Sequence, residues 1–497
     1  MLENILMGLV NTFSPINLTL CVLGVAIGII FGALPGFSAT MGVAVFVPFS
    51  YVLQPQGALL ILSGIYCGGV YGGCIPAVLL GIPGTPASAP TAFEGRALTA
   101  RGESGKALML ATLGSTIGGV ISSIALLLFA PVLALIAMEV GAPEQVMIAI
   151  FGLSVVCMLS EGNMIKGMLV GAVSLLLATI GQDPVLGFPR YTFGMYQLIG
   201  GLSVVPVLIG LFSMPEVFAM LEKPLGKITE VNSVNKMKIS IKDLTSNAVN
   251  SFRSAIFGVV IGIIPAAGPD IASFLAYNEA KKASKKPEEF GNGSIEGIIA
   301  AESANNGVTG GSLIPLLTLA VPGSAPAAIF LGAMIIHGLR PGPLLFTQNA
   351  EDVYTLLVGF LIINILIFFI GCFFCKIAGK ILLIPKTILA ITIIFLSIVG
   401  SFSIQQNMFD VIVMFIAGII GYIMTKNNFP LSPVALALLL GPMLEESLML
   451  TGVMFDGNYL MMFTRPLTII FAILTLISVV YPIIKKKFIK TNHMCDM

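Results

Sequence analysis

The stretch GIYCGGVYGGCIPAVLLGIPGTPASAPT, from Gly64 to Thr91, decides the fold of this chain, because a second version of it follows far downstream. That version, from Glu302 to Ala328, reads ESANNGVTGGSLIPLLTLAVPGSAPAA. Each contains Gly-Val-x-Gly-Gly, then an apolar run with a proline, then Pro-Gly followed by a hydroxyl residue, Thr85 or Ser324. We expect both stretches to be broken, non-helical backbone that is held at membrane depth and forms a binding site.

The composition around both stretches is that of a membrane protein. Of 497 residues, 57% are hydrophobic and 10% are charged, whereas a soluble domain carries about a quarter charged residues. The mean hydropathy is +1.01. The apolar runs are continuous and lack the short alternation of barrel strands, so we predict an all-α polytopic membrane protein with about a dozen transmembrane segments, some of them broken or re-entrant. A net charge of +1 gives no bulk attraction to nucleic acid.

A basic segment divides the chain into two halves. Residues 221–253 hold six basic side chains against three acidic ones, and the positive-inside rule places such a segment in the cytoplasm. We therefore expect a first transmembrane repeat over 1–220, a cytoplasmic linker over 221–253, a second repeat over 254–484 and a basic cytoplasmic tail over 485–497. The expected location is the plasma (cytoplasmic or inner) membrane.

Three matches in the same order indicate an internal repeat. The segments GIIFGALP, from Gly28 to Pro35, and GVVIGIIP, from Gly258 to Pro265, lie 230 residues apart. The Gly-Val-x-Gly-Gly copies lie 238 apart and the Pro-Gly copies 239 apart, and the insertion Ala280–Glu289 accounts for the growth. The residues leave open whether the repeats are inverted or parallel. Lys281 to Lys286 raise a topological difficulty, because one crossing after a cytoplasmic linker would place them outside.

Proline and glycine in an apolar segment break a helix. Proline removes a backbone donor, and glycine permits close approach of backbone or ligand. The freed N–H and C=O groups must find partners in lipid, and a cation together with an anionic substrate would supply them. We expect helix breaks at Pro35, Pro83, Pro265 and Pro322.

Neutral oxygen and amide side chains cluster beside these breaks. They can coordinate Na⁺ and orient a carboxylate without the cost of a buried charge. The alternative is close packing of small residues, which we consider the better account of the glycines in GIIFGALP and GVVIGIIP but not of the Pro-Gly stretches. From the residues alone, the candidate site comprises Thr85, Ser88, Ser303, Asn305, Asn306, Thr309, Ser312 and Ser324.

Asp270 and Glu302 are the acidic residues nearest the repeated motifs. Each is costly in lipid, so each is either a cation-binding or proton-binding group or a loop or interface residue. Arg96, Arg340 and His337 could meet an anionic substrate, although snorkelling to the interface is the better explanation for the two arginines. We expect residues 92–106, which carry charges of both signs, to form a loop.

The sequence lacks the motifs of other function classes. It has no G-x-x-x-x-G-K-[ST], no H-E-x-x-H and no G-x-S-x-G, so an ATPase, a zinc protease and a serine hydrolase are unsupported. We expect no enzyme, no resident cofactor and no metal beyond transient Na⁺. Passive, channel-like conduction of a carboxylate is the first alternative to active transport, and a membrane-embedded enzyme acting on lipid-linked substrates is the second.

A series of longer motifs runs in order along the chain, at Gly32–Gly36, Gly64–Gly73, Ile82–Ala89, Val204–Phe212, Glu302–Asn306, Val321–Ser324, Gly338–Pro343 and Leu440–Glu446. With these motifs the chain resembles the large membrane subunit of the tripartite tricarboxylate transporters, the TctA type, over essentially its whole length. The segment Pro265–Gly268 departs from the family pattern, because it carries alanine where glycine is common.

The resemblance implies a secondary transporter in which a cation gradient drives uptake of a small tricarboxylate or dicarboxylate. The expected coupling ion is Na⁺, with H⁺ as the other option. The resemblance also implies inverted repeats, an elevator-like movement, a small TctB-type membrane subunit, and a TctC-type extracytoplasmic solute-binding protein that delivers substrate. The ion and substrate region that it implies maps to Gly84, Thr85, Ser303, Asn305, Asn306, Gly323 and Ser324.

Overall fold

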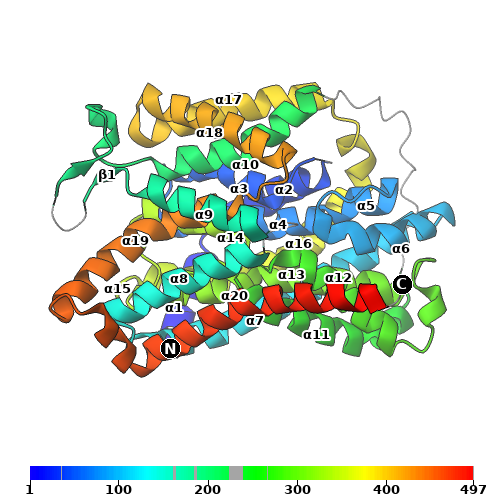
Figure 1. Ribbon diagram of the computed structural model, residues 1–497. Helices are drawn as coiled ribbons and strands as arrows, with labels where there is room; N and C mark the ends of the chain where they lie inside the picture. The colour runs from blue at the N-terminus through cyan, green and yellow to red at the C-terminus, as the bar shows by residue number, and fades with distance from the viewer. Residues whose placement is uncertain (35, 160–163, 184–186, 223–238, 266, 496–497) are drawn as a thin grey trace.

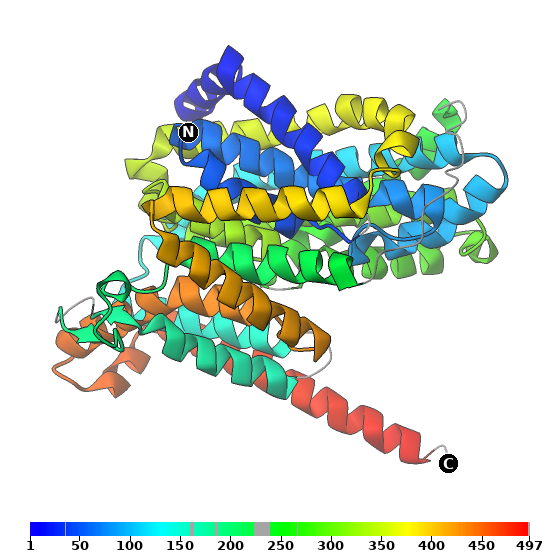
Figure 2. The same ribbon diagram turned by 90° about the horizontal axis from the view of Figure 1, so that it is seen from above.

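The computed structural model describes residues 1–497 apart from 35, 160–163, 184–186, 223–238, 266 and 496–497. Figures 1 and 2 show a layered bundle of helices with one small hairpin projecting from it. Strands β1 (Gly181–Gln182) and β2 (Pro189–Arg190) pair antiparallel in this hairpin. By length and composition, eight helices in the described part could cross a membrane, and five shorter apolar helices accompany them. The prediction of an all-α polytopic membrane protein is confirmed.

The helices before the linker are α1 (Leu2–Thr12), α2 (Pro15–Ala33), α3 (Ala39–Ser50), α4 (Pro55–Gly72), α5 (Cys74–Leu80), α6 (Ala89–Ala100), α7 (Ser104–Ala137), α8 (Ala142–Leu159), α9 (Met164–Ala178) and α10 (Val204–Glu222). Those after it are α11 (Ile241–Ile263), α12 (Gly268–Ala283), α13 (Ile295–Leu319), α14 (Ala325–Ile336), α15 (Leu345–Gln348), α16 (Ala350–Ile381), α17 (Lys386–Gln405), α18 (Met408–Lys426), α19 (Ser432–Met454) and α20 (Pro466–Cys495). Short 3₁₀ turns are η1 (Pro86–Ser88), η2 (Tyr196–Leu198), η3 (Pro287–Glu289) and η4 (Tyr459–Thr464).

The predicted boundaries fall partly outside the described residues. Pro35, one of the expected helix breaks, lies there, as do residues 223–238 of the predicted linker, whereas α11 already begins at Ile241 within its predicted bounds. At the other end of the chain, α20 continues through the predicted tail as far as Cys495. The division into two repeats therefore stays a prediction.

Glycine allows α2 to pack directly on α4. A Cβ atom on Gly28 would lie 2.5 Å from the carbonyl oxygen of Ile65. The second half shows the same packing, because a Cβ on Gly262 of α11 would lie 2.8 Å from the carbonyl oxygen of Val308 in α13. These glycines are therefore packing residues that let two helix backbones touch.

Helix α13 is enclosed on all sides. Every residue from Gly297 to Thr318 is buried, and the helix packs against α4, α6, α7, α11 and α12. The core around it therefore consists of elements from both halves of the chain.

The lysine-rich segment 281–286 lies at the same end of the molecule as the start of α11. Lys106 Nζ, at the start of α7, lies 3.5 Å from Asp243 Oδ2 at the start of α11. Asn250 Nδ2 of α11 donates to the carbonyl oxygen of Glu296 (3.0 Å), just after this segment. Helices α11 and α12 thus run out and back as a hairpin. This resolves the topological difficulty, because the lysines return to the end from which α11 starts.

Residues 92–106, which we expected to form a loop, are mostly helical. Helix α6 extends to Ala100, and α7 begins at Ser104. Pro90 lies in the first turn of α6, where its missing N–H costs nothing. Glu94 is fully buried and accepts hydrogen bonds of 2.6–2.7 Å from three backbone N–H groups between Gly291 and Ser294. The expectation was wrong because it took this charge as a sign of solvent exposure.

Candidate functional site

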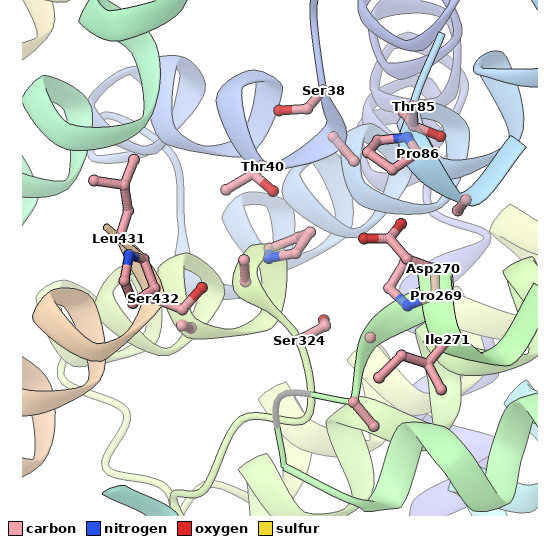
Figure 3. A pocket seen from close by; sticks show the side chains of 18 of the residues that line it. Ser38, Thr40, Thr85, Pro86, Pro269, Asp270, Ile271, Ser324, Leu431 and Ser432 are labelled. Carbon is pink, nitrogen blue, oxygen red and sulfur yellow. The ribbon is translucent and has the colours of Figure 1, made fainter. Parts of the chain in front are cut away.

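A cavity of about 520 Å³ lies where the two interrupted segments meet (Figure 3). Thr85 and Pro86 line it from the first segment, and Pro322 and Ser324 line it from the second. Asn305 lines it from the middle of α13. The two Pro-Gly stretches, far apart in sequence, therefore share one cavity.

The first break follows α5. Gly81 ends this helix in the left-handed region (φ +69°), and Thr85 is extended. Gly84 N donates to the carbonyl oxygen of Gly73 (3.1 Å). A Cβ atom on Gly84 would collide with the carbonyl oxygen of Gly32 and lie 2.8 Å from the Cα of Gly73. Only glycine fits this position without a shift of the backbone.

The second break follows α13 and has the same construction. Ala320 ends the helix in the left-handed region (φ +59°), and Ser324 is extended. Gly323 N donates to the carbonyl oxygen of Ser312 (3.4 Å). A Cβ on Gly323 would collide with the carbonyl oxygen of Gly262 and lie 2.8 Å from the Cα of Ser312. Donor and acceptor both lie 239 positions after their counterparts in the first break.

Tyr66 of α4 connects the second break to the first half of the chain. Its hydroxyl lies 2.8 Å from the Oγ of Ser312 and 2.8 Å from the Oγ of Ser324, and its side chain is fully buried. In the first break, Thr85 Oγ1 lies 3.3 Å from Ser88 Oγ. We did not predict Tyr66, because a contact between residues so far apart in sequence leaves no local pattern.

The starts of five helical elements meet at the cavity. The lining residues that belong to them are Ser38–Thr40 at α3, Pro86–Ala87 at η1, Gly268–Ile271 at α12, Ser324–Pro326 at α14, and Leu431–Ser432 at α19. Backbone N–H groups at a helix start lack intrahelical partners and carry the positive end of the helix dipole. The described lining contains no lysine or arginine. The positive groups of the described wall are therefore backbone N–H groups rather than basic side chains, and the acidic side chains Asp270 and Glu216 also belong to it.

Oxygen groups that suit a cation also face the cavity. Asp270 is half-buried, and Figure 3 shows its carboxylate directed toward Thr85 and Pro86. Asn305 Nδ2 donates to the carbonyl oxygen of Val70 (3.3 Å), but its Oδ1 is buried without a hydrogen-bond partner. An amide oxygen without a donor, near a carboxylate and hydroxyls, is a set of ligands that suits a monovalent cation.

Other predicted residues lie behind the cavity wall. Ser303 Oγ donates to the carbonyl oxygen of Gly114 (3.0 Å), and Thr309 Oγ1 donates to that of Asn306 (2.7 Å). The side-chain amide of Asn306 is buried, and neither of its polar atoms has a partner. Gly84, Ser88 and Gly323 belong to the breaks themselves. These residues shape the wall or the helix interfaces around it.

A further part of the cavity wall was not predicted. The connection between α18 and α19 lines the cavity from Asn428 to Ser432. The sequence Asn-Asn-Phe-Pro between two apolar runs is the signal that could have identified it, since such residues interrupt a helix.

The predicted basic candidates lie elsewhere. His337 Nε2 lies 3.1 Å from Ser50 Oγ, at the ends of α14 and α3. Arg340 is exposed, and the stem of Arg96 packs against Gly81. None of the three lines the described cavity. Within the described residues, no three His, Cys, Asp or Glu side chains lie together as a metal site would require.

The comparison with known families agrees with this architecture. The model described as the tripartite tricarboxylate transporter TctA family matches residues 18–436. The chain belongs to this family. A TctA protein is a component of a tripartite transporter, so this chain is a multi-pass membrane protein of a transport system.

Two relatives of this TctA protein come from Agrobacterium vitis. An uncharacterized 52.8 kDa protein in the TAR-I ttuC' 3' region is 34% identical over 467 residues, which cover 94% of this chain and 93% of the relative. An uncharacterized protein in the TAR-II ttuC' 3' region is 35% identical over 210 residues, covering 42% of this chain and 87% of the relative. No solved structure matches the chain.

The TctA protein also buries two carboxylates between α6 and α13. Glu94 accepts from Tyr277 Oη (2.6 Å) in addition to its three backbone donors. Glu302 accepts from two hydroxyls, Thr91 Oγ1 at 2.6 Å and Ser115 Oγ at 2.8 Å, and the side-chain amide of Asn305 is a further polar partner. Both carboxylates are fully buried, but Glu302 has fewer donors.

Proposed function

We propose that this TctA protein is the transporting subunit of a secondary active transporter, in which a cation gradient drives uptake of a small carboxylate. The observation that carries the proposal is the cavity between the two breaks, whose described wall combines five helix starts with no lysine or arginine. Helix N-termini bind carboxylates. The volume lies within the range of about 300–1,000 Å³ that is typical of small-molecule sites. A tricarboxylate or dicarboxylate is the substrate class that we propose.

Two acidic residues give a physical reason for cation coupling. Asp270 and Glu216 both line the cavity, and carboxylate oxygens are suitable ligands for a cation that binds beside the substrate. A cation bound there attracts an incoming carboxylate, and Asn305 Oδ1 and Thr85 Oγ1 supply further oxygen ligands. Substrate affinity then depends on the cation, which is the condition for coupling. We expect Na⁺, with H⁺ as the other option.

The cavity reaches the linker end of the molecule. Thr425 and Asn428 line it and are exposed there. Lys426 Nζ lies 2.7 Å from Glu222 Oε1, at the last residue of α10 before the linker. Since the positive-inside rule makes this end cytoplasmic, we propose that the described conformation faces inward. Uptake then requires an outward-facing conformation, reached by an elevator-like movement of inverted repeats.

Two partners complete the proposed transporter. A small TctB-type membrane subunit accompanies the chain in the plasma (inner) membrane, and a TctC-type extracytoplasmic solute-binding protein delivers the carboxylate. The support for this proposal is the family description, which names a tripartite system.

Reconstitution of the protein with both partners in lipid vesicles tests the proposed function. Labelled citrate and labelled succinate are the probes, and the vesicles carry an inward Na⁺ gradient, an inward proton gradient, both gradients or neither. We expect label to accumulate above its external concentration only when a gradient is present. Equilibration without accumulation would instead identify a passive pathway and contradict the proposal.

A further inference from the structure

We infer that Glu302 is a second cation-binding residue, separate from the oxygen ligands that line the cavity, and that one positive charge on its carboxylate controls how α6 docks on α13. The cation is Na⁺ or H⁺, which share the property of neutralising a single carboxylate. The inference rests on the proposed function, because it identifies the residue through which a cation would act on the substrate cavity.

The first argument is that the Glu302 carboxylate has too few partners for a buried anion. Each of its oxygens accepts one hydroxyl, from Thr91 on α6 or from Ser115 on α7. In the described part of the chain, no lysine, arginine or histidine forms an ion pair with it. The third polar partner, the side-chain amide of Asn305, is also uncharged. A buried charge without an opposite charge is costly, and a carboxylate that accepts only from neutral groups still has lone pairs for a cation.

Glu94 provides an internal comparison for this argument. It lies three residues after Thr91 on the same helix and is equally buried. Three backbone N–H groups at the start of α13 and the hydroxyl of Tyr277 stabilise its negative charge. The same helix interface therefore holds one carboxylate whose charge is compensated by the protein and one whose charge is not.

The other ionisable groups around this part of α13 supply no positive charge. Helices α4 and α5 present Tyr66, Cys67 and Cys74, which are buried, and phenols and thiols are uncharged when protonated. Cys74 is near enough to Glu302 to interact with it electrostatically. Helix α6 presents Glu94, whose charge is already compensated. The nearest helices with basic residues use them elsewhere, since Lys106 of α7 pairs with Asp243 and Arg253 Nη2 of α11 donates to Asn250 Oδ1. We therefore assign the compensating charge for Glu302 to a bound cation.

Glu302 is placed to connect a bound cation with the substrate cavity. One turn further along α13, Asn305 lines the cavity. Thr91, which donates to Glu302, follows three residues after Ser88, and Ser88 ends the turn that leads from Thr85. A change of charge on Glu302 changes its hydrogen bond to Thr91 and, with it, the position of the first break.

The test measures the cation dependence of labelled citrate uptake in vesicles that contain the complete transporter. Thr91→Val removes one donor to the carboxylate and should shift the half-saturating cation concentration about tenfold, the effect of one hydrogen bond to a charged group. Thr99→Val is the matched control, because the hydroxyl of Thr99 on the same helix donates to the carbonyl oxygen of Val78 (2.8 Å). Separate titrations of Na⁺ and of pH identify which cation binds.

Glu302→Gln and Glu302→Asp complete the test. Glutamine cannot be neutralised by a cation, so Glu302→Gln should lose gradient-driven accumulation, whereas Glu302→Asp should retain it with a shifted cation concentration. If Glu302→Gln accumulates citrate as the unchanged protein does, or if Thr91→Val and Thr99→Val show the same half-saturation, the inference is wrong. If the unchanged protein itself fails to accumulate label, the proposed function fails instead. If the Glu302→Gln complex cannot be purified, the half-saturating cation concentration of Thr91→Val, compared with that of Thr99→Val, decides the inference.

Discussion

Ser324 illustrates how much one residue does at a helix break. Its hydroxyl accepts from Ala327 N (3.4 Å) at the start of α14, lies 2.8 Å from the hydroxyl of Tyr66, and belongs to a residue that lines the cavity. Ser324 could be predicted, because a hydroxyl residue directly after Pro-Gly is a local pattern. Tyr66 could not be predicted, because 258 positions separate it from this partner.

Replacement of Ser324 by alanine should lower the initial rate of labelled citrate uptake about tenfold, because the variant loses one hydroxyl toward the cavity and its contact with Tyr66. The matched control is Thr318→Val. The Thr318 hydroxyl is also buried, but it donates to the carbonyl oxygen of Ile314 (2.8 Å), and Thr318 does not belong to the described lining. If the two variants take up citrate at equal rates, at equal amounts of reconstituted protein, Ser324 does not contribute to the binding site.

Among the elements, the two breaks were easier to predict than helix α6. A Pro-Gly pair in an apolar run interrupts a helix for local reasons, and Pro83 and Pro322 do lie between helices. The expectation that the two whole stretches are non-helical was wrong, because α4 and α5 cover most of the first and α13 covers most of the second. Helix α6 was missed because Glu94 finds its donors almost two hundred residues downstream, at the start of α13. A sequence pattern cannot distinguish such a buried carboxylate from one in a solvated loop.

Gly84→Ala should lower the thermal unfolding temperature of the purified protein by several degrees. The added methyl group would collide with the carbonyl oxygen of Gly32, and forcing extra volume into packed backbone costs about 1–3 kcal/mol. Gly200→Ala serves as the control, since a Cβ there meets nothing within 4 Å. Unfolding is followed in detergent with a thiol-reactive dye, because the chain has no tryptophan. An unchanged midpoint for Gly84→Ala would mean that the break has room to relax.

The whole molecule has a basic end and an end where arginines are paired with acids. At the first end lie Lys106, the start of α11 and the segment 281–286. At the other, Arg190 pairs with Glu445 at the β-hairpin, which Figure 1 shows on the side opposite to α6. Composition predicted the membrane class, but it could not show that α11 and α12 form a hairpin. Their lengths of 23 and 16 residues do not by themselves show whether the chain crosses the membrane once or turns back to the side from which it started.

This arrangement predicts which residues face the cytoplasm. In a background without reactive native cysteines, a cysteine in place of Phe193, which is 81% exposed near the β-hairpin, should react with a membrane-impermeant maleimide on intact cells. A cysteine in place of Lys282, whose side chain is 73% exposed, should react only after the cells are permeabilised. Labelling of both positions on intact cells would contradict the proposed orientation.

The enclosure of α13 has a consequence for biogenesis. This helix carries Glu302, Asn305 and Asn306, and it is not among the helices that are apolar enough to cross a membrane by composition. Polar residues oppose release of a nascent helix into lipid. By the time α13 is synthesised, however, α4, α6 and α7 have already emerged, and their faces cover its polar groups. The first half of the chain would then serve as a template that receives the second, so the order of synthesis contributes to the final fold.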